Sequence, residues 1–263
     1  MRLVQIFFSP TGGTKKVLEI ISGVWDCEKT EIDLSDPNRD FSNIMLRESD
    51  LCLVAVPSFG GRVPGVALSR LSKIKGNGAS AVLIAVFGNR AIDDTLLELK
   101  DTLGSLSFRC VAAVSAAAEH SIMHQFGAGR PDKDDERRLL AFARKIKESA
   151  GQNTAPGLTV PGHFPYREYH GVPFRPKAGK SCTRCGLCAR ECPVGAIPED
   201  APFGTIEEKC VSCMRCISAC PQNARALNKA MLFAASRKMK KECAERKENE
   251  LFISSTEAGR GTL

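Results

Sequence analysis

The residues best suited to chemistry are eight of the 12 cysteines, which lie close together late in the 263-residue chain. The spacing Cys182-x2-Cys185-x2-Cys188-x3-Cys192-Pro193 recurs unchanged as Cys210-x2-Cys213-x2-Cys216-x3-Cys220-Pro221. Such a local density of thiols indicates metal chemistry rather than a disulfide framework. The repeat also indicates that this part of the chain is internally duplicated.

This spacing is the one with which bacterial ferredoxins bind two [4Fe–4S] clusters, the fourth cysteine of each run serving the other cluster. We therefore expect one cluster on Cys182, Cys185, Cys188 and Cys220, and a second on Cys210, Cys213, Cys216 and Cys192. Structural zinc also uses paired cysteines. Zinc gives no reason, however, for a third step and a Cys-Pro end that are both repeated.

A second candidate site is the loop Ser9-Pro10-Thr11-Gly12-Gly13-Thr14, which follows an apolar, β-prone segment and precedes a helical pattern. The hydroxyls of Ser9, Thr11 and Thr14 and the backbone N–H groups of a helix N-terminus can surround a phosphate. Gly12 and Gly13 permit close approach of the backbone. The loop matches neither GxxxxGK[ST] nor GxGxxG. The alternative is an ordinary helix capped by a threonine.

This loop resembles the FMN phosphate loop of the flavodoxin family, which is of the [ST]-x-T-G-x-T type. The resemblance implies that the loops after strands three and four hold the flavin ring. These loops carry Pro57, Ser58, Phe59, Gly60, Gly61, Phe87, Gly88, Asn89 and Arg90. Phe59 is the candidate for stacking on the ring, unless it packs only on its own domain. Arg90 is the candidate for the N1/C2=O edge, unless it is solvated.

Other polar residues near these loops have weaker claims to a role. Asp93 and Asp94 are expected in the first turn of a helix, where acidic residues are favoured. His120 follows the fifth expected strand and can approach either cofactor or serve as a structural histidine. The chain has no convincing acid/base pair and no NAD(P) fingerprint.

The elements that must position these loops alternate along residues 1–150. Strand-like segments cover residues 3–8, 28–34, 51–56, 79–87 and 108–115, and helical patterns cover 14–23, 92–103 and 132–149. Continuous apolar runs are typical of strands buried on both faces. We expect an α/β fold with a doubly wound, five-stranded parallel sheet in the flavodoxin-like order 2-1-3-4-5.

The rest of the chain divides by composition. We expect a flavodoxin-like FMN-binding domain at 1–150, a Pro-rich connector at 151–180, a small α+β ferredoxin domain at 181–228, and a basic helix and tail at 229–263. The connector is either a flexible linker or a docked segment. Five side chains, His163, Phe164, Tyr166, Tyr169 and Phe174, give it anchors that a free spacer does not need.

Charge and hydropathy limit the partners and the location that we expect for this protein. Residues 1–150 carry a net charge of +1 and residues 151–263 carry +6 of the total +7. Two four-thiolate clusters add about −4, so nucleic acid is not needed to explain the basic bias. No apolar run approaches the ~18–20 residues of a membrane span, and no signal peptide is evident. We expect a cytoplasmic protein with reduced thiols.

As a whole the chain resembles the EFR-type ferredoxin–flavodoxin fusions, including the segments Gly88-Asn89-Arg90-x-x-Asp93-Asp94 and Gly129-Arg130-Pro131-Asp132. The resemblance implies electron transfer between FMN, two [4Fe–4S] clusters and external redox proteins. Two alternatives stay open. One is a flavin-dependent reductase of a small acceptor such as a quinone, a nitro compound or another flavin. The other is a redox sensor or assembly module without flavin. The oligomeric state is left open.

Overall fold

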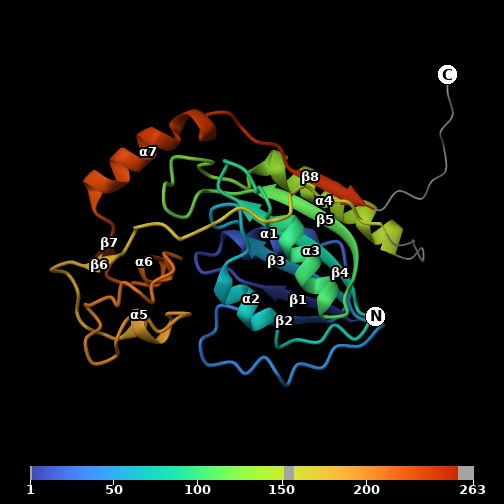
Figure 1. The fold of residues 1–263 in the computed structure, drawn as a ribbon, viewed down its shortest axis with the longest axis horizontal. Coiled ribbons are helices and arrows are strands. Elements are labelled where there is room, and N and C mark those ends of the chain that lie inside the picture. The colour runs from blue at the N-terminus through green and yellow to red at the C-terminus, as the bar shows by residue number, and fades with distance from the viewer. Residues whose placement is uncertain (1, 151–156, 254–263) are drawn as a thin grey trace.

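The computed structural model describes residues 2–150 and 157–253. The start of the expected connector (151–156) and the end of the expected tail (254–263) lie outside the described residues. The first half consists of β1 (Leu3–Phe7), α1 (Gly13–Ser22), β2 (Lys29–Asp33), β3 (Leu51–Pro57), α2 (Gly65–Leu71), β4 (Ser80–Phe87), α3 (Thr95–Ser105), β5 (Arg109–Ala117) and α4 (Lys133–Ala150) (Figure 1).

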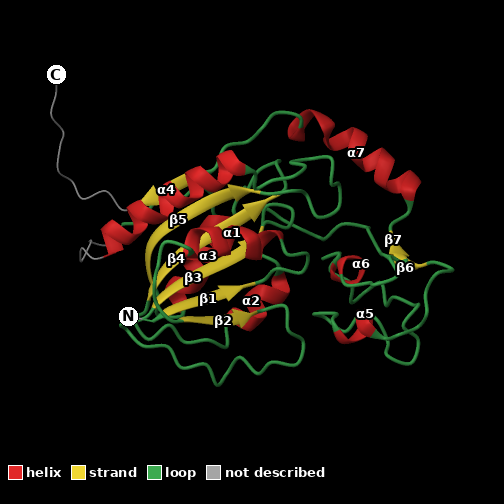
Figure 2. Cartoon of the chain, turned by 180° about the vertical axis from the view of Figure 1, so that it is seen from behind, coloured by secondary structure: helices red, strands yellow, loops and turns green. Residues whose placement is uncertain are grey.

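Five parallel strands lie side by side in the order β2-β1-β3-β4-β5 (Figure 2). This is the flavodoxin-like order of a doubly wound sheet, and it confirms the expected fold. In such a sheet the loops after neighbouring parallel strands meet at one edge, which is where ligands bind. The loops after β1, β3, β4 and β5 therefore share an edge.

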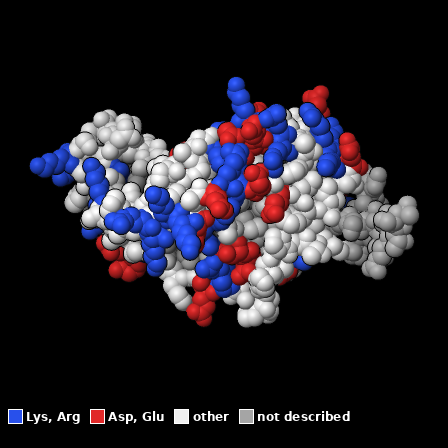
Figure 3. All heavy atoms as spheres, turned by 90° about the horizontal axis from the view of Figure 1, so that it is seen from above, with Lys and Arg blue, Asp and Glu red and all other residues white. Residues whose placement is uncertain are grey.

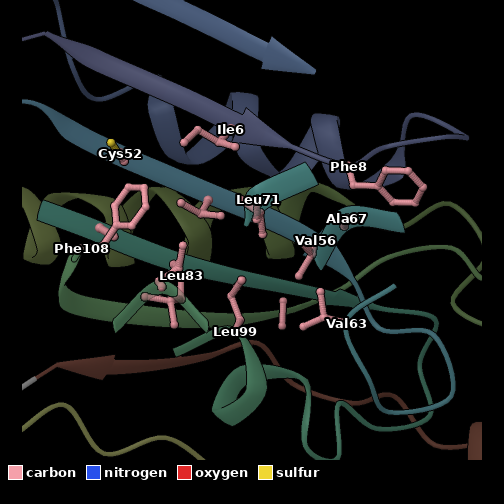
Figure 4. Packing of buried hydrophobic residues seen from close by; sticks show 14 of the residues in the cluster. Ile6, Phe8, Cys52, Val56, Val63, Ala67, Leu71, Leu83, Leu99 and Phe108 are labelled. Atoms are coloured by element: carbon pink, nitrogen blue, oxygen red, sulfur yellow. The ribbon is translucent and has the colours of Figure 1, made fainter. Parts of the chain in front are cut away.

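The sheet is covered on both faces, which explains why its central strands are apolar along their whole length. On one face Leu71 of α2 and Leu99 of α3 pack near Leu83 of β4 (Figure 4). On the other face Leu18 of α1 and Leu139 of α4 belong to a second buried cluster. These two layers fix the strands and hence the positions of the loops at their ends.

A sixth strand, β8 (Glu250–Ile253), pairs antiparallel with β5, with Ala112 opposite Ile253 and Ser115 opposite Glu250. Composition predicts a basic helix and tail for this segment, and that prediction is wrong for residues 250–253, where pairing with β5 makes a strand. An unpaired edge strand leaves a row of N–H and C=O groups open, and β8 satisfies those of β5. The chain thus returns to its first domain after the cysteine-rich part.

The cysteine-rich part contains the ribbon of β6 (Lys177–Ala178) and β7 (Arg225–Ala226) and the short helices α5 (Leu187–Arg190) and α6 (Arg215–Ser218). The backbone repeats with the sequence. Arg184 and Ser212 have φ of 56° and 55°, and Gly186 and Met214 have φ of 76° and 63°. The members of each pair occupy equivalent positions in the two cysteine runs. The duplication seen in the sequence is therefore also a duplication of backbone conformation.

The connector and the C-terminal helix α7 (Lys229–Cys243) join the two domains (Figure 1). Phe174 of the connector, Met214 of the cysteine-rich part and Cys243 of α7 are buried in one cluster with Met123 and Phe126 of the first domain. Four segments that are distant in the sequence thus share a small core. Within the described part of the chain, no helix is both long and apolar enough to cross a membrane.

Direct hydrogen bonds reinforce this packing. Arg70 Nη2 of α2 donates to the carbonyl of Pro193 at 2.7 Å. Arg215 Nη1 and Ser218 Oγ both donate to the carbonyl of Pro10, each at 3.3 Å. The contacts to Pro10 place α6 directly beside the loop that follows β1. The cysteine-rich part is therefore docked against the sheet edge that carries the candidate flavin loops.

Candidate functional site

A cavity of about 590 Å³ lies at this edge of the sheet. Its volume falls within the ~300–1,000 Å³ of small-molecule and cofactor sites. Residues of all four loops line it, including Thr11 after β1, Phe59 after β3, Arg90 after β4 and His120 after β5. We call it the sheet-edge cavity. It brings together segments that the sequence analysis proposed separately.

The loop after β1 presents three of its five predicted residues to the sheet-edge cavity. Thr11, Gly13 and Thr14 line the wall, whereas Ser9 and Gly12 do not. Ser9 is buried, and its Oγ accepts a hydrogen bond from the backbone N–H of Lys15 at 2.9 Å. Gly12 has φ of 90°, a left-handed conformation that glycine adopts without strain. The first-turn N–H groups of α1 lack intrahelical acceptors and carry the positive end of the helix dipole.

The loops after β3 and β4 contribute nearly all of their predicted residues. Pro57, Ser58, Phe59, Gly60, Gly61, Phe87, Gly88 and Arg90 line the cavity. Asn89 does not. It is buried, and its Nδ2 donates to the carbonyls of Cys243 and Glu245, both at 2.9 Å. Asn89 thus holds the segment that leaves α7, which is a structural contact that the sequence analysis did not foresee.

Aromatic side chains line the cavity from two directions. Phe59 stands edge-on to Phe8, with ring centroids 6.4 Å apart and an interplanar angle of 73°. Tyr169 of the connector covers Gly60, because a Cβ at Gly60 would lie 2.3 Å from the tyrosine ring. Burial raises the pKa of Tyr169. The loops themselves lack Trp and Tyr, and the connector supplies the missing aromatic side chain.

The side of the cavity opposite the sheet is formed by parts of the chain that the sequence analysis did not assign to the site. They are Arg167, Tyr169, Val172, Pro173 and Phe174 of the connector, Ser212 and Cys213 of the cysteine-rich part, and Met231, Ala235, Lys238, Met239 and Glu242 of α7. The methionines at 231 and 239 and the acid at 242 follow a helical spacing. That spacing predicts that these residues share one face of α7, but it does not predict which part of the chain this face contacts.

Asp93 and Asp94 lie before α3, which begins at Thr95, and not within its first turn as expected. Asp93 pairs with Arg90, and its Oδ2 also accepts a bond from Arg167. Asp94 accepts the backbone N–H groups of His163 at 2.8 Å and Arg167 at 2.7 Å. These hydrogen bonds lower the pKa of Asp94 although burial opposes them. The two acids therefore fasten the connector beside the cavity.

His120 lines the cavity, and its Nδ1 accepts the backbone N–H groups of Ile122 at 3.1 Å and Met123 at 3.2 Å. Burial lowers the pKa of His120 to about 4, and the nearby His124 and Arg90 act in the same direction. The imidazole is thus neutral at physiological pH. With Nδ1 accepting, the neutral ring carries its proton on Nε2.

The eight repeated cysteines fall into two groups by position. Four of them, Cys182, Cys185, Cys188 and Cys220, line one cavity; we call them the outer cysteine group, because Cys185 is exposed. The others, Cys192, Cys210, Cys213 and Cys216, form the inner cysteine group, of which Cys213 also lines the sheet-edge cavity. Each group therefore takes three cysteines from one repeat and one from the other.

The thiols of the inner group interact electrostatically. Burial, and to a smaller extent the neighbouring thiols of Cys192, Cys216 and Cys210, raise the pKa of Cys213 to about 12. Burial also raises the pKa of Cys216 to about 11. Thiols crowded in this way ionise only when a cation or cluster accepts their charge, since coordination deprotonates them outright. The donor set therefore fits an iron–sulfur group.

Backbone N–H groups support the last cysteine of each repeat in the same manner. Ala196 N donates to Cys192 Sγ at 3.2 Å and Ala224 N donates to Cys220 Sγ at 3.3 Å. At Cys220, partial burial raises the pKa, but the N–H bonds from the following residues lower it below the usual value. Hydrogen bonds to sulfur are one of the means by which proteins set cluster potentials.

Comparison with known protein families supports the iron–sulfur interpretation of the cysteine-rich part. Residues 181–225 match the protein family described as 4Fe-4S dicluster domain. No curated protein matches the chain. This part of the chain is therefore a ferredoxin-type, iron–sulfur domain.

Solved structures similar to the chain include several flavodoxins. Oxidised flavodoxin 1 from Bacillus cereus is 19% identical, with a TM-score of 0.41, and the match covers 56% of this chain and 98% of that one. The Streptococcus pneumonia TIGR4 flavodoxin is 16% identical, with a TM-score of 0.41 and coverage of 57% and 99%. Fusobacterium nucleatum flavodoxin bound to flavin mononucleotide is 13% identical, with a TM-score of 0.40 and coverage of 56% and 98%.

The strand order defines the first domain by itself. A sheet of order β2-β1-β3-β4-β5 with helices on both faces is flavodoxin-like, and the 4Fe–4S domain follows it in the same chain. The chain therefore combines a domain of flavodoxin-like fold with a 4Fe–4S domain.

Proposed function

We propose that this chain is an electron-transfer protein that holds FMN in the sheet-edge cavity and one [4Fe–4S] cluster in each cysteine group. The observation that carries the proposal is the shared wall. Ser212 and Cys213, which belong to the cluster-binding loop, line the same cavity as Thr11, Phe59 and Arg90. A cluster ligand in the wall of the flavin cavity leaves no room for an intervening protein partner.

We expect the two ends of the cavity to bind different parts of FMN. Thr11, Gly13 and Thr14 would hold the phosphate of FMN with their hydroxyls and first-turn N–H groups. The loops at 57–61 and 87–90 would hold the ring, with Phe59 and Tyr169 as its aromatic neighbours. When bound, FMN exchanges one or two electrons and each cluster exchanges one.

The remaining lining residues control water and charge around that site. α7 and the connector cover the side opposite the sheet, and Met231, Ala235 and Met239 present apolar surface there. Arg90 brings a positive charge to the loop after β4 and is held by Asp93. Positive charge near the N1 edge of a flavin is one of the protein's means of tuning its electronics. His120 stays neutral and acts as a polar, uncharged wall.

The external partner of this proposal is a redox protein. α7 carries Lys229, Arg237, Lys238, Lys240 and Lys241 against a single acidic residue, Glu242. Lysines and arginines gather on this side of the molecule (Figure 3). A basic surface beside the cofactors favours an acidic redox protein, whose association should weaken as ionic strength rises.

Content and kinetics together test the proposal. Anaerobically purified protein should yield FMN on acid extraction and about eight iron and eight acid-labile sulfides per chain, four per cluster. After flash reduction of the clusters, flavin reduction should proceed at a rate that stays constant over a tenfold dilution, because both sites share one wall. A rate that falls in proportion to concentration would show that the centres communicate only between molecules.

A docking variant sharpens this test. The double substitution Arg70→Ala and Arg215→Ala removes donors to the carbonyls of Pro193 and Pro10, and should slow the intramolecular step. Arg144, which is exposed on α4, provides the matched control in Arg144→Ala, and should leave the rate unchanged. Equal rates in all three proteins would contradict the importance of the docked arrangement.

A further inference from the structure

The two halves of the cysteine repeat differ at a position that is buried in both of them. Ala196 in the first half corresponds to Ala224 in the second, and the next pair is Ile197 and Arg225. Ile197 is 4% exposed and packs with Cys188, Ala189 and Cys216. Arg225 is 3% exposed. An arginine therefore occupies, in one half, the place that an apolar side chain occupies in the other.

Arg225 is held by neutral oxygen atoms. Its Nη1 donates to the carbonyl of Pro176 at 3.0 Å and to Thr205 Oγ1 at 2.9 Å. Its Nη2 donates to the carbonyls of Pro202 at 2.9 Å and Gly204 at 2.6 Å. These acceptors fix the guanidinium without neutralising it, since each of them is uncharged. A buried guanidinium without a carboxylate partner is rare, because burying a charge is costly.

The third donor group of Arg225, the Nε–H, lacks an acceptor within the described part of the chain. Among the described residues, Nε of Arg225 is the one buried side-chain polar atom with no hydrogen-bond partner. Arg225 lines the cavity formed by the outer cysteine group, together with all four of its thiols. A buried N–H without an acceptor destabilises the folded protein, because it has lost its hydrogen bonds to water. The sulfur atoms of a cluster in this cavity would supply both an acceptor and a counter-charge.

Arg225 belongs to the site of the outer cysteine group. Of the two cavities described above, the one lined by the outer cysteine group includes Arg225 in its wall, and the sheet-edge cavity does not.

We propose that Arg225 is a buried charge that raises the reduction potential of the outer [4Fe–4S] cluster and makes it the more readily reduced of the two. This inference rests on the proposed function, since it requires a cluster in each group. A four-thiolate cluster carries about −2 and gains a further negative charge on reduction. A cation beside it favours the reduced form, in the way that an opposite charge within ~4–6 Å shifts an ionisation by one or more tenfold steps.

EPR-monitored redox titration of the full chain tests the inference. Arg225→Gln keeps a polar side chain and removes the charge. It should lower the potential of the outer cluster by at least about 59 mV, which is a tenfold change in a one-electron equilibrium. Arg225→Lys keeps the charge but loses the forked hydrogen bonds, and should recover most of that shift. A merely structural role predicts the same change for both variants, and that result would overturn the inference.

Arg190→Gln is the matched control. Arg190 is exposed and its Nη1 donates to the carbonyl of Cys185, a ligand of the same group, at 3.3 Å. Because solvent and salt screen an exposed charge, this variant should shift the outer potential much less than Arg225→Gln. An equal shift in the two variants would show that burial of Arg225 has no special effect.

If the Arg225→Gln variant does not assemble its clusters, redox titration of the wild-type protein still tests the inference. Its two clusters should be reduced in separate steps, and Cys185→Ser should alter the signal that is reduced first. Simultaneous reduction, or first reduction of the inner cluster, would overturn the inference. The iron, sulfide and FMN contents of each preparation distinguish a failure of the proposed function from a failure of the role assigned to Arg225. A wild-type chain without two clusters refutes the proposed function itself, whereas intact clusters with the reverse order refute only the role of Arg225.

Discussion

Removing two hydroxyls from the loop after β1 should weaken FMN binding without weakening the binding of riboflavin. Thr11 and Thr14 both line the cavity, and Thr14 is buried in the first turn of α1. The double substitution Thr11→Val and Thr14→Val keeps the shape of each side chain and removes one donor from each. Riboflavin has the same ring as FMN but no phosphate, so its affinity reports on the rest of the site.

The magnitude follows from the two lost bonds. A hydrogen bond to a charged group contributes about 1.5–3 kcal/mol, so two such bonds amount to about 3–6 kcal/mol. Since about 1.4 kcal/mol is tenfold in affinity, the Kd for FMN should rise by roughly a hundredfold to ten-thousandfold. Thr11 is half-buried, so water can replace part of its bond, which favours the lower end of this range.

Fluorescence titration of the flavin-free protein with FMN and with riboflavin provides the assay. Ser9→Ala is the control within the same loop, because Ser9 does not line the cavity and its Oγ accepts only the Lys15 N–H. This variant should lose about 1 kcal/mol of stability, because the Lys15 N–H loses its acceptor, and it should keep its preference for FMN over riboflavin. An unchanged FMN affinity in the double variant, or an equal loss for riboflavin, would place the phosphate elsewhere.

Three further outcomes are expected. Cys192→Ala should damage the inner cluster and spare the cluster bound by its sequence neighbours, which EPR or Mössbauer spectra of the anaerobic protein would reveal; selective loss of the outer cluster would contradict the crossed ligation. Gly60→Ala should lower FMN affinity, because Gly60 has φ of 59° and a Cβ there meets the ring of Tyr169. Gly65→Ala, where a Cβ meets no atom within 4 Å, should leave the affinity unchanged. His120 is neutral in the folded protein, with its pKa lowered to about 4 by burial, so the unfolded chain takes up a proton first as the pH falls. The free energy of unfolding should therefore decrease from about pH 6.5 down to pH 4, and His120→Gln should reduce this slope in urea titrations; an unaltered slope would assign the dependence to other groups.

The sequence determined the parts of this protein that depend on short-range pattern. Apolar runs at 51–56 and 79–87 predicted central strands, and β3 and β4 lie within a residue or two of them. The alternation of strands and helices predicted a doubly wound parallel sheet, for which the order 2-1-3-4-5 is one of the two common solutions. The cysteine spacing predicted the iron–sulfur domain, because the sequence intervals between the cysteines determine which of them can reach the same cluster.

Local pattern also had identifiable limits. Asn89 and Ser9 are next to cavity residues in the sequence, yet their side chains bond to backbone groups and not to the cavity. A loop motif cannot tell which of its side chains face the ligand, because that depends on where the loop turns. β8 was missed because a four-residue strand (Glu250–Ile253) at the end of a charged segment carries too short a pattern to be distinguished from a tail.

Only the tertiary structure decided how the two halves of the chain meet. The spacing predicts that Cys213 is a cluster ligand, but its place in the wall of the cavity at the end of β3 and β4 requires the docking of α6 beside Pro10. Tyr169 and Met239 join the same wall from segments with no motif of their own. Such contacts between residues distant in the chain arise when separate apolar faces are buried together. No interval along the chain encodes them, because burial is a property of the folded surface and not of the local sequence.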